Sequence, residues 1–342
     1  MLNENIRFLK KSFRFKRFIN AIKVYLSYYL SLMIRKSIYW GFPPVVMIEP
    51  TNICNLKCPL CPSGNGTLKR PKGYMEFSLF KKLIDEIKDR SFMVVLWNQG
   101  ESYLNKDFLK MVKYASDNGL FTLVSTNANV DFQPEKTIKA GLDSMIVSLD
   151  GTTQETYNKY RVNGNLEKVI RNVKQLILTK KKLNAKNPLI RWQFLVMKHN
   201  EHEIDDIKKM AKEMKVDNLE LKTIQIYSKD DILNYLPENP KYRRYKVTGD
   251  DFELKFGIKN RCHRIWTNAV VNWDGEVAIC CFDKDVEHKI GNIKKTSLSE
   301  IWKGAAIRKI RNQILMDRNE IEICRNCGES VKLRIKQIEV RK

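Results

Sequence analysis

The sequence predicts an α/β fold in which a parallel sheet is followed by a small cysteine-rich domain. Short apolar runs alternate with longer amphipathic stretches between residues 45 and 224, which is the pattern of repeated strand–helix units. All eight cysteines fall in two groups, near residue 58 and after residue 261, which indicates two separate cysteine sites. With 342 residues, 43% of them hydrophobic, the chain suits one domain of barrel size and a smaller one.

Residues 1–40 are basic and rich in aromatic side chains, with nine Lys or Arg residues against the single acid Glu4. Between Phe18 and Ile34 apolar residues recur at helical spacing, which predicts an amphipathic helix. The opposite side of this helix is polar: Asn20, Lys23, Ser27 and Ser31. These polar residues make it a poor membrane span, so the helix either lies on an anionic membrane surface or packs on the protein itself.

Six strands are predicted between residues 45 and 224: Val45–Glu49, Met93–Asn98, Phe121–Thr126, Ser144–Asp150, Ile190–Met197 and Leu219–Ile224. Five helices separate them: Ser78–Lys88, Lys106–Asn118, Pro134–Ala140, Leu166–Lys182 and Glu203–Lys215. Strands joined through helices run parallel, with right-handed crossovers. Polar side chains at the carboxyl ends of these strands are therefore expected to meet at one end of the sheet.

The last third of the chain follows a different pattern. Residues 227–257 are polar and contain several turn formers, so they are predicted to be an irregular linker. The pair Asp274-Gly275 between two apolar runs predicts a hairpin with a two-residue turn. Ser297-Leu-Ser-Glu300 is a capping box that opens a helix expected to reach about Ile314. Residues 331–342 form a basic tail.

The run Cys54-Asn-Leu-Lys-Cys58-Pro-Leu-Cys61 can hold three irons of a [4Fe–4S] cluster and leave the fourth iron open. With this motif the sequence resembles the radical S-adenosylmethionine (SAM) enzymes, whose open iron binds the amino and carboxylate groups of SAM. The resemblance extends over about residues 45–330. It implies a partial (β/α)6 TIM-type barrel over residues 41–226, and cleavage of SAM to a 5′-deoxyadenosyl radical that abstracts a substrate hydrogen.

The resemblance also implies a set of SAM-binding residues at the strand ends. Gly100-Glu101-Ser102 stands where the family usually has Gly-Glu-Pro, which holds the SAM amino group, with Ser102 in place of Pro. Further contacts to the SAM ribose and carboxylate are implied for Ser125, Asn127, Ser148, Asp150 and Arg161. Taken singly, most of these residues are ordinary loop formers. The sequence identifies no catalytic acid, base or hydrogen donor.

The later cysteines Cys262, Cys280, Cys324 and Cys327 resemble the short form of the SPASM/twitch extension, here residues 258–330. The resemblance implies that these four cysteines hold one auxiliary [4Fe–4S] cluster that relays electrons. Spacing favours Cys280 over Cys281 as the ligand, and adjacent strand residues point to opposite faces, but the choice stays open. The alternative is a structural zinc site with four thiolates and no electron-transfer role.

The predicted function is oxidation, dehydration or epimerisation of a small polar, glycan-like or lipid-linked substrate. Residues 1–40 are too short for the leader-binding module that peptide-modifying relatives usually carry. The alternatives are modification of a ribosomally made peptide or of RNA. A net charge of +23 motivates RNA, but the absence of a recognisable RNA-binding module makes RNA the less favoured partner.

The expected reducing partner is a protein such as flavodoxin or ferredoxin. No cleavable signal peptide is evident, and reduced thiols suit a cytoplasmic location. A peripheral position on the inner face of the membrane, through residues 1–40, is the further expectation for where the protein works.

Overall fold

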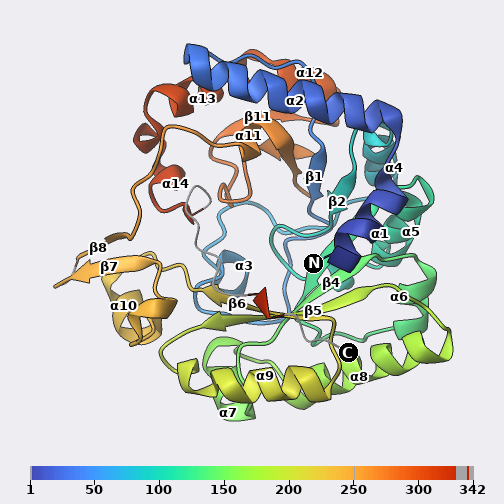
Figure 1. Ribbon diagram of the computed structural model, residues 1–342, viewed down its shortest axis with the longest axis vertical. Helices are drawn as coiled ribbons and strands as arrows, with labels where there is room; N and C mark the ends of the chain where they lie inside the picture. Colours follow the sequence, from blue (N-terminus) through green and yellow to red (C-terminus); the bar gives the residue numbers. More distant parts are fainter. Residues whose placement is uncertain (1, 250, 329–336, 339–342) are drawn as a thin grey trace.

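The computed structural model describes residues 2–249, 251–328 and 337–338 (Figure 1). Six strands run parallel as neighbours in chain order: β1 (Val45–Ile48), β2 (Met93–Val95), β3 (Phe121–Thr126), β4 (Ser144–Ser148), β5 (Leu189–Val196) and β6 (Asn218–Thr223). They curve into a partial barrel with helices on the outside, so the predicted fold class is confirmed. Of the predicted basic tail, all but residues 337 and 338 lies outside the described residues.

The barrel helices are α4 (Phe77–Ile87), α5 (Phe108–Asp117), α6 (Pro134–Lys139), α8 (Leu166–Lys182) and α9 (Ile204–Glu213). Each begins and ends within two residues of its predicted bounds. Sequence analysis missed α3 (Pro62–Asn65) and α7 (Gln154–Tyr160). The residues of α7 are mostly polar, so no apolar period announces it, and its start is fixed instead by the Thr153 side chain, which accepts from the Thr156 amide.

The strands bury one side more than the other. In β5, Trp192 and Phe194 lie fully buried in the main core cluster, whereas Gln193 and Leu195, which alternate with them, are half-buried. Because neighbouring strand residues point to opposite faces, the half-buried set faces the barrel interior. The interior is therefore partly open, and polar side chains line it.

The C-terminal part continues the barrel sheet. Strands β9 (Asn268–Val271), β10 (Glu276–Ala278) and β11 (Lys289–Asn292) follow one another in space, and β9 pairs in parallel with β1. The predicted hairpin exists, but its turn has three residues rather than two. Asn272 and Glu276 form the closing hydrogen bond at 2.8 Å, and Gly275 takes φ 86°, the glycine-favouring conformation that ends such three-residue loops.

The helices of this part are α11 (Arg264–Thr267), α12 (Leu298–Lys303), α13 (Ala305–Met316) and α14 (Glu322–Arg325). The predicted capping box between Ser297 and Glu300 opens α12. The prediction of one continuous helix to Ile314 is wrong, because Gly304 is extended at ψ 168° and separates α12 from α13.

The segment predicted to be irregular, residues 227–257, contains helix α10 (Lys229–Tyr235) and the antiparallel strand pair β7 (Tyr245–Thr248) and β8 (Asp251–Leu254). A capping box between Ser228 and Asp231, which sequence analysis overlooked, starts the helix. These elements project from one side of the barrel (Figure 1).

Residues 2–34 form two helices, α1 (Leu2–Ser12) and α2 (Phe15–Ile34), rather than one. They pack on the protein through polar contacts at the amino ends of the strands. Arg17 donates to the carbonyls of Lys88 and Gly119, and Asn20 donates to that of Phe42 at 2.7 Å. Of the two alternatives predicted for this helix, the structure therefore shows packing on the protein itself. Among the described residues, no helix is long and apolar enough to cross a membrane.

Candidate functional site

The first three cysteines lie in the loop that leaves the carboxyl end of β1. Cys58 is buried, and Cys54 and Cys61 are half-buried. The sulfurs are close enough for Cys58 and Cys61 to raise the pKa of Cys54 electrostatically. Two side chains from other segments reach them. Asn127, after β3, places Nδ2 3.8 Å from the Cys54 sulfur, and Arg161, at the end of α7, places Nη1 3.7 Å from the Cys58 sulfur.

Burial favours the protonated form of two of these thiols, Cys54 and Cys58. It raises the pKa of Cys54 to about 12, the largest effect on that group. Burial also raises the pKa of Cys58, while the Arg161 guanidinium lowers it in part. Metal binding requires thiolates, so loading of this loop must displace protons.

The donor set of the loop fits a [4Fe–4S] cluster. Within the part of the chain that the structure describes, no group of three His, Cys, Asp or Glu side chains could hold a single metal ion. A [4Fe–4S] cluster does not need three side chains to converge on one ion, because each thiolate binds a different iron. Three clustered thiols with N–H donors beside two of them match the sulfur-ligated, hydrogen-bonded surroundings of such clusters.

Gly100 packs against the backbone that leads into the cysteine loop. Its φ is 74°, and an added Cβ would stand 2.6 Å from the Thr51 oxygen and 2.7 Å from the Ile53 oxygen. The next amide, of Glu101, donates to the same Ile53 oxygen at 2.8 Å. Only glycine tolerates both the conformation and the approach, so this residue sets the position of the loop.

The side chains of Glu101 and Ser102 are occupied by the protein. The Glu101 carboxylate accepts from the Asn127 amide at 2.7 Å and the Thr126 hydroxyl at 2.9 Å. Burial raises its pKa, and these hydrogen bonds lower it in part. The Ser102 hydroxyl donates to the Leu96 carbonyl at 2.7 Å. Both side chains thus tie the turn to β2 and β3, and neither is exposed above 1%.

Asp150 and Arg161 form a buried ion pair beside Cys58. Arg161 Nε donates to Asp150 Oδ2 at 2.6 Å, and Asp150 Oδ1 accepts from the Leu195 amide at 2.7 Å. Burial lowers the pKa of Arg161, but Asp150 and then Cys58 raise it more, so the net direction is upward. The guanidinium is therefore a fixed cation that links a strand end to the cysteine loop.

Ser125 and Ser148 lie at the ends of β3 and β4. Within the described residues neither hydroxyl has a hydrogen-bond partner; Ser125 is half-buried, and Ser148 is 7% exposed. Gln193, paired with Ser148 across β4 and β5, is half-buried and faces the interior. Asn200, also a candidate from its place after the fifth strand, is fully buried and donates to the Asp150 and Leu195 carbonyls, which makes it a turn residue.

Sequence analysis missed a buried ion pair next to the site. Arg70 binds both oxygens of Glu49, with Nη1 at 2.7 Å from Oε1, and Glu49 also accepts from the Gln99 amide at 3.2 Å. Burial raises the pKa of Glu49, and Arg70 lowers it in part. Arg70 Nε donates in turn to the Lys284 carbonyl. An acid ending an apolar strand was the only sequence signal for this clamp between the barrel and the C-terminal part.

The second cysteine group separates Cys280 from Cys281. Cys262, Cys280 and Cys324 share one apolar cluster, whereas Cys281 packs in another cluster beside Val270. Burial raises the pKa of Cys280, with Cys281, Cys262 and Cys324 as further causes. This grouping favours Cys280, as the spacing does.

Arg318 is the cation of the second group. It is 1% exposed, and it lies within electrostatic reach of Cys262, Cys324 and Cys327. Burial lowers the pKa of Arg318, but these sulfurs raise it more. Sequence analysis did not select it, because nothing in the chain order places it beside the cysteines.

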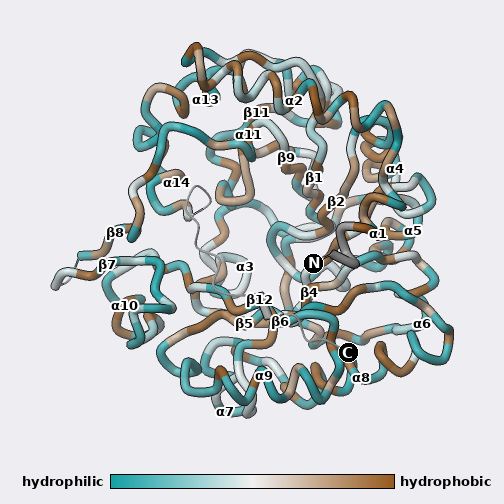
Figure 2. The backbone as a smooth tube through the Cα atoms, in the orientation of Figure 1, coloured by the Kyte–Doolittle hydropathy of each residue, from teal (hydrophilic) through white to brown (hydrophobic). Residues whose placement is uncertain are grey.

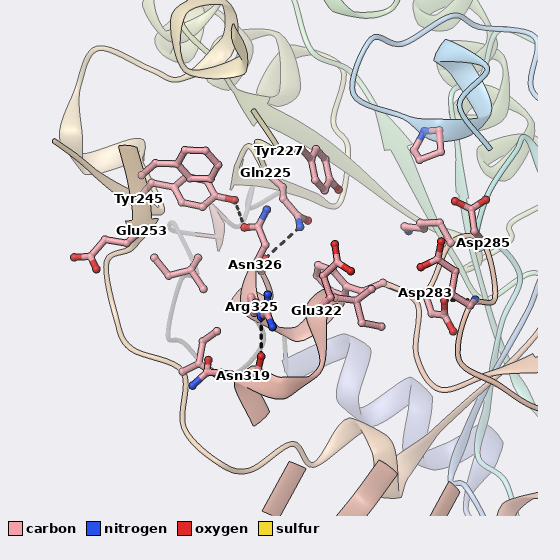
Figure 3. Close-up of a pocket in the computed structure, with 18 of the residues that line it drawn as sticks. Gln225, Tyr227, Tyr245, Glu253, Asp283, Asp285, Asn319, Glu322, Arg325 and Asn326 are labelled. Carbon is pink, nitrogen blue, oxygen red and sulfur yellow. Dashed lines mark hydrogen bonds between the residues drawn. The ribbon is translucent and has the colours of Figure 1, made fainter. Parts of the chain in front are cut away.

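A cavity of about 760 Å³ is lined by sequence neighbours of both cysteine groups (Figure 3). Its wall includes Pro62, next to Cys61, and Asn326, between Cys324 and Cys327. Tyr245 donates to Asn326 Oδ1 at 2.7 Å and so fixes one side of the wall. Acidic side chains outnumber Lys284 and Arg325 in the lining: Glu253, Asp283, Asp285, Glu287 and Glu322.

Two family models match this chain, the "Radical SAM superfamily" over residues 48–182 and the SPASM "Iron-sulfur cluster-binding domain" over residues 262–328. Together they match more than half of it. The PqqA peptide cyclase of Bradyrhizobium diazoefficiens is 27% identical over 55% of this chain and 48% of its own. The mycofactocin maturase MftC of Mycobacterium tuberculosis is 30% identical over 37% of this chain and 33% of its own length. The chain thus spans about half, or less, of the curated relatives it matches.

Solved structures resemble the fold. BtrN in complex with AdoMet and 2-DOIA superposes with a TM-score of 0.54 and 17% identity over 85% of this chain and 94% of BtrN. Streptococcus suis SuiB bound to S-adenosylmethionine superposes with a TM-score of 0.59 and 15% identity, over 84% of this chain and 73% of SuiB. The family models and the fold agree with the cysteine motif at the barrel mouth, and the chain belongs to the radical SAM superfamily, with a SPASM-type domain after its partial barrel.

Proposed function

We propose that this protein is a radical SAM enzyme that modifies a peptide. The observation that carries the proposal is the cavity, which extends from the residue after Cys61 to the residue between Cys324 and Cys327. A substrate in this cavity would lie between two metal sites. The proposal assigns the barrel to residues 41–226 and the auxiliary domain to residues 258–330.

Cys54, Cys58 and Cys61 are the proposed ligands of the SAM-binding [4Fe–4S] cluster. When loaded, this cluster supplies the electron that cleaves SAM reductively and starts hydrogen abstraction from the substrate. The N–H groups of Asn127 and Arg161 would stabilise the negative charge on its sulfurs. The Glu49–Arg70 pair would hold the loop against the barrel.

The remaining rim residues divide into two roles. Ser125 and Ser148, whose hydroxyls have no hydrogen-bond partner within the described residues, are the proposed contacts to SAM. The segment Gly100 to Ser102 would act mainly by holding the turn backbone in place, since the Glu101 and Ser102 side chains already have protein partners. Asp150 would fix Arg161 rather than contact SAM itself.

Cys262, Cys280, Cys324 and Cys327 are the proposed ligands of the auxiliary [4Fe–4S] cluster, and the separate packing of Cys281 supports the choice of Cys280. Four thiolates leave no iron open, so this cluster would transfer electrons and not bind substrate. The reducing partner would be a flavodoxin- or ferredoxin-like protein. A zinc ion held by the same four thiols is the competing assignment.

The peptide replaces the glycan-like or lipid-linked substrate that the sequence favoured. A relative named as a PqqA peptide cyclase supports it. The charge of the cavity supports it as well: its lining is acidic in a chain of net charge +23. A carboxylate-lined wall disfavours lipid-linked pyrophosphates and RNA, and it favours neutral or basic side chains.

The first experiment is anaerobic reconstitution followed by iron and sulfide analysis. About eight irons per chain are expected for two cubes, with formation of 5′-deoxyadenosine from SAM. Cys58→Ala should leave about four irons and no 5′-deoxyadenosine. Cys281→Ala is the matched control and should keep both clusters. About four irons with one zinc in the native protein would contradict the auxiliary cluster.

The substrate class is tested by adding peptides with Lys or Arg, matched acidic peptides, or oligosaccharides to the loaded enzyme. We expect basic peptides to stimulate 5′-deoxyadenosine formation and to transfer deuterium into it when labelled. Stimulation by oligosaccharides alone would contradict the peptide assignment without affecting the SAM site.

A further inference from the structure

The outward side of α2 is apolar along its whole length. Large hydrophobic side chains at helical spacing are exposed there: Phe18, Ile22, Tyr25, Leu26, Tyr29 and Met33. Leu26 is 55% exposed and Met33 is 80% exposed. The hydropathy colouring shows apolar segments recurring along α2 at the outer edge of the molecule (Figure 2). Isolated exposed apolar residues are normal, but a continuous stripe of this kind marks an interaction surface.

The side facing the protein contains Arg17 and the uncharged polar residues of the helix. Arg17, Asn20, Ser27 and Ser31 are all buried, with exposures of 7% or less. Asn20 is held by hydrogen bonds at both ends of its amide: Nδ2 donates to the Phe42 carbonyl, and Oδ1 accepts from the Phe42 amide. Because these contacts fix the rotation of α2, its apolar stripe cannot turn inward without breaking them.

Basic residues flank the stripe. Lys16, Lys23 and Lys36 are exposed, and Glu4 is the only acid in the first 40 residues. An apolar helix face with Lys side chains beside it is the composition of helices that lie in an anionic membrane surface. The Lys chains are long enough to reach the headgroups while the stripe enters the acyl region.

We propose that the outward face of α2 docks on an anionic lipid bilayer. A second copy of this chain is the less suitable occupant, because two such faces would bring like charges from both copies together. A lipid surface supplies both the apolar phase and the opposite charge. The proposal is independent of the function assigned to the cavity.

Docking through α2 also sets the orientation of the enzyme. The carbonyls that Arg17 and Asn20 bind precede β1, β2 and β3, so α2 covers the amino ends of the strands. The cysteine loop lies after the carboxyl end of β1. The barrel mouth would therefore face away from the bilayer, which suits a substrate that arrives from the aqueous side.

The test is flotation of the full-length protein with phosphatidylcholine vesicles that contain phosphatidylglycerol. We expect binding that weakens as salt is raised. Leu26→Glu with Met33→Glu should weaken it more than tenfold, since one buried aliphatic side chain alone contributes about that factor. The matched control is Leu178→Glu with Leu233→Glu, two residues that are 56% and 62% exposed on other helices.

Four results would overturn the proposal. They are no binding of the native protein at low salt, equal binding to pure phosphatidylcholine, an equal loss in the control variant, or a native dimer that the α2 variant separates. If the α2 variant fails to fold, a second measurement on the native protein still tests the docking. Trp40, 52% exposed after α2, should be quenched by brominated lipids, with Trp40→Phe as background. Absence of quenching would likewise contradict docking.

Discussion

At the scale of single residues, the structure places buried cations beside both cysteine groups. Arg161 reaches Cys58 from the end of α7, and Arg318 lies within electrostatic reach of Cys262 and Cys324. Iron–sulfur clusters with thiolate ligands are anionic, so a fixed cation nearby stabilises them and tunes their reduction potential. The two arginines differ in one respect: Arg161 already has a carboxylate partner, Asp150.

Changing Arg318 to Leu should lower the reduction potential of the auxiliary cluster. Reduction adds negative charge, and loss of a buried cation makes that charge less stable. A unit charge about 4 Å away contributes on the order of 1 kcal/mol at a dielectric constant of about 80 and about 4 kcal/mol at about 20. This energy corresponds to roughly 50–170 mV for a one-electron couple.

The measurement is a redox titration followed by electron paramagnetic resonance, in a background without Cys54, Cys58 and Cys61. Arg325→Leu is the matched control, because Arg325 is exposed and close in sequence. It should shift the potential little. An equal shift in both variants, or none with Arg318→Leu at full iron content, would contradict the assigned role.

Cluster loading should be faster at higher pH. The pKa of Cys54 is raised to about 12, and that of Cys58 is also raised, so both are neutral thiols at pH 7. A raised thiol pKa means that protons must leave on loading, and a rise in pH favours their departure. Iron incorporation should increase between pH 7 and pH 8.5, with release of protons measurable in weak buffer. A flat profile would contradict protonated thiols in the apo protein.

At the scale of elements, turns and caps decide where the site residues stand. Gly100 and Gly66 both have positive φ, 74° and 80°, but only Gly100 has backbone atoms where a Cβ would go. Substitutions at the two glycines therefore distinguish the cost of backbone strain from the cost of steric contact with the cysteine loop.

Gly100→Ala should lower the Tm strongly and prevent loading of the first cluster. Gly66→Ala should cost only the strain of the left-handed conformation, about 1–2 kcal/mol, because nothing lies within 4 Å of its added Cβ. Thermal unfolding and iron content measure both effects. Equal losses in the two variants would show that strain, and not contact with the loop, governs this turn.

At the scale of the whole molecule, one sheet joins the two parts. β9 pairs with β1, and Tyr28 of α2 packs on Trp266 of the C-terminal part with ring centres 5.3 Å apart. The buried Glu49–Arg70 pair of the barrel adds two further links, because Arg70 donates to the Lys284 carbonyl and Glu49 accepts from the Trp273 amide. The cavity that neighbours of both cysteine groups line depends on this attachment.

A chain ending at residue 257 should aggregate rather than fold as an independent barrel. Its loss of β9 would expose the apolar edge of β1, and unpaired edge strands favour association with other chains. Light scattering and size-exclusion chromatography measure this, with the full-length protein prepared without iron as the control. A monomeric, folded truncation would contradict the role of the shared sheet.

The sequence by itself determined the six barrel strands, the five helices between them and the metal motif, because period-2 and period-3.6 patterns and cysteine spacing are local signals. It also supplied the amphipathic character of α2. Only the tertiary structure decided that Asn20 and Ser27 face inward and that Arg318 lies within electrostatic reach of the later cysteines. These outcomes depend on contacts between residues far apart in the chain, and neither propensity nor spacing encodes which surfaces will meet.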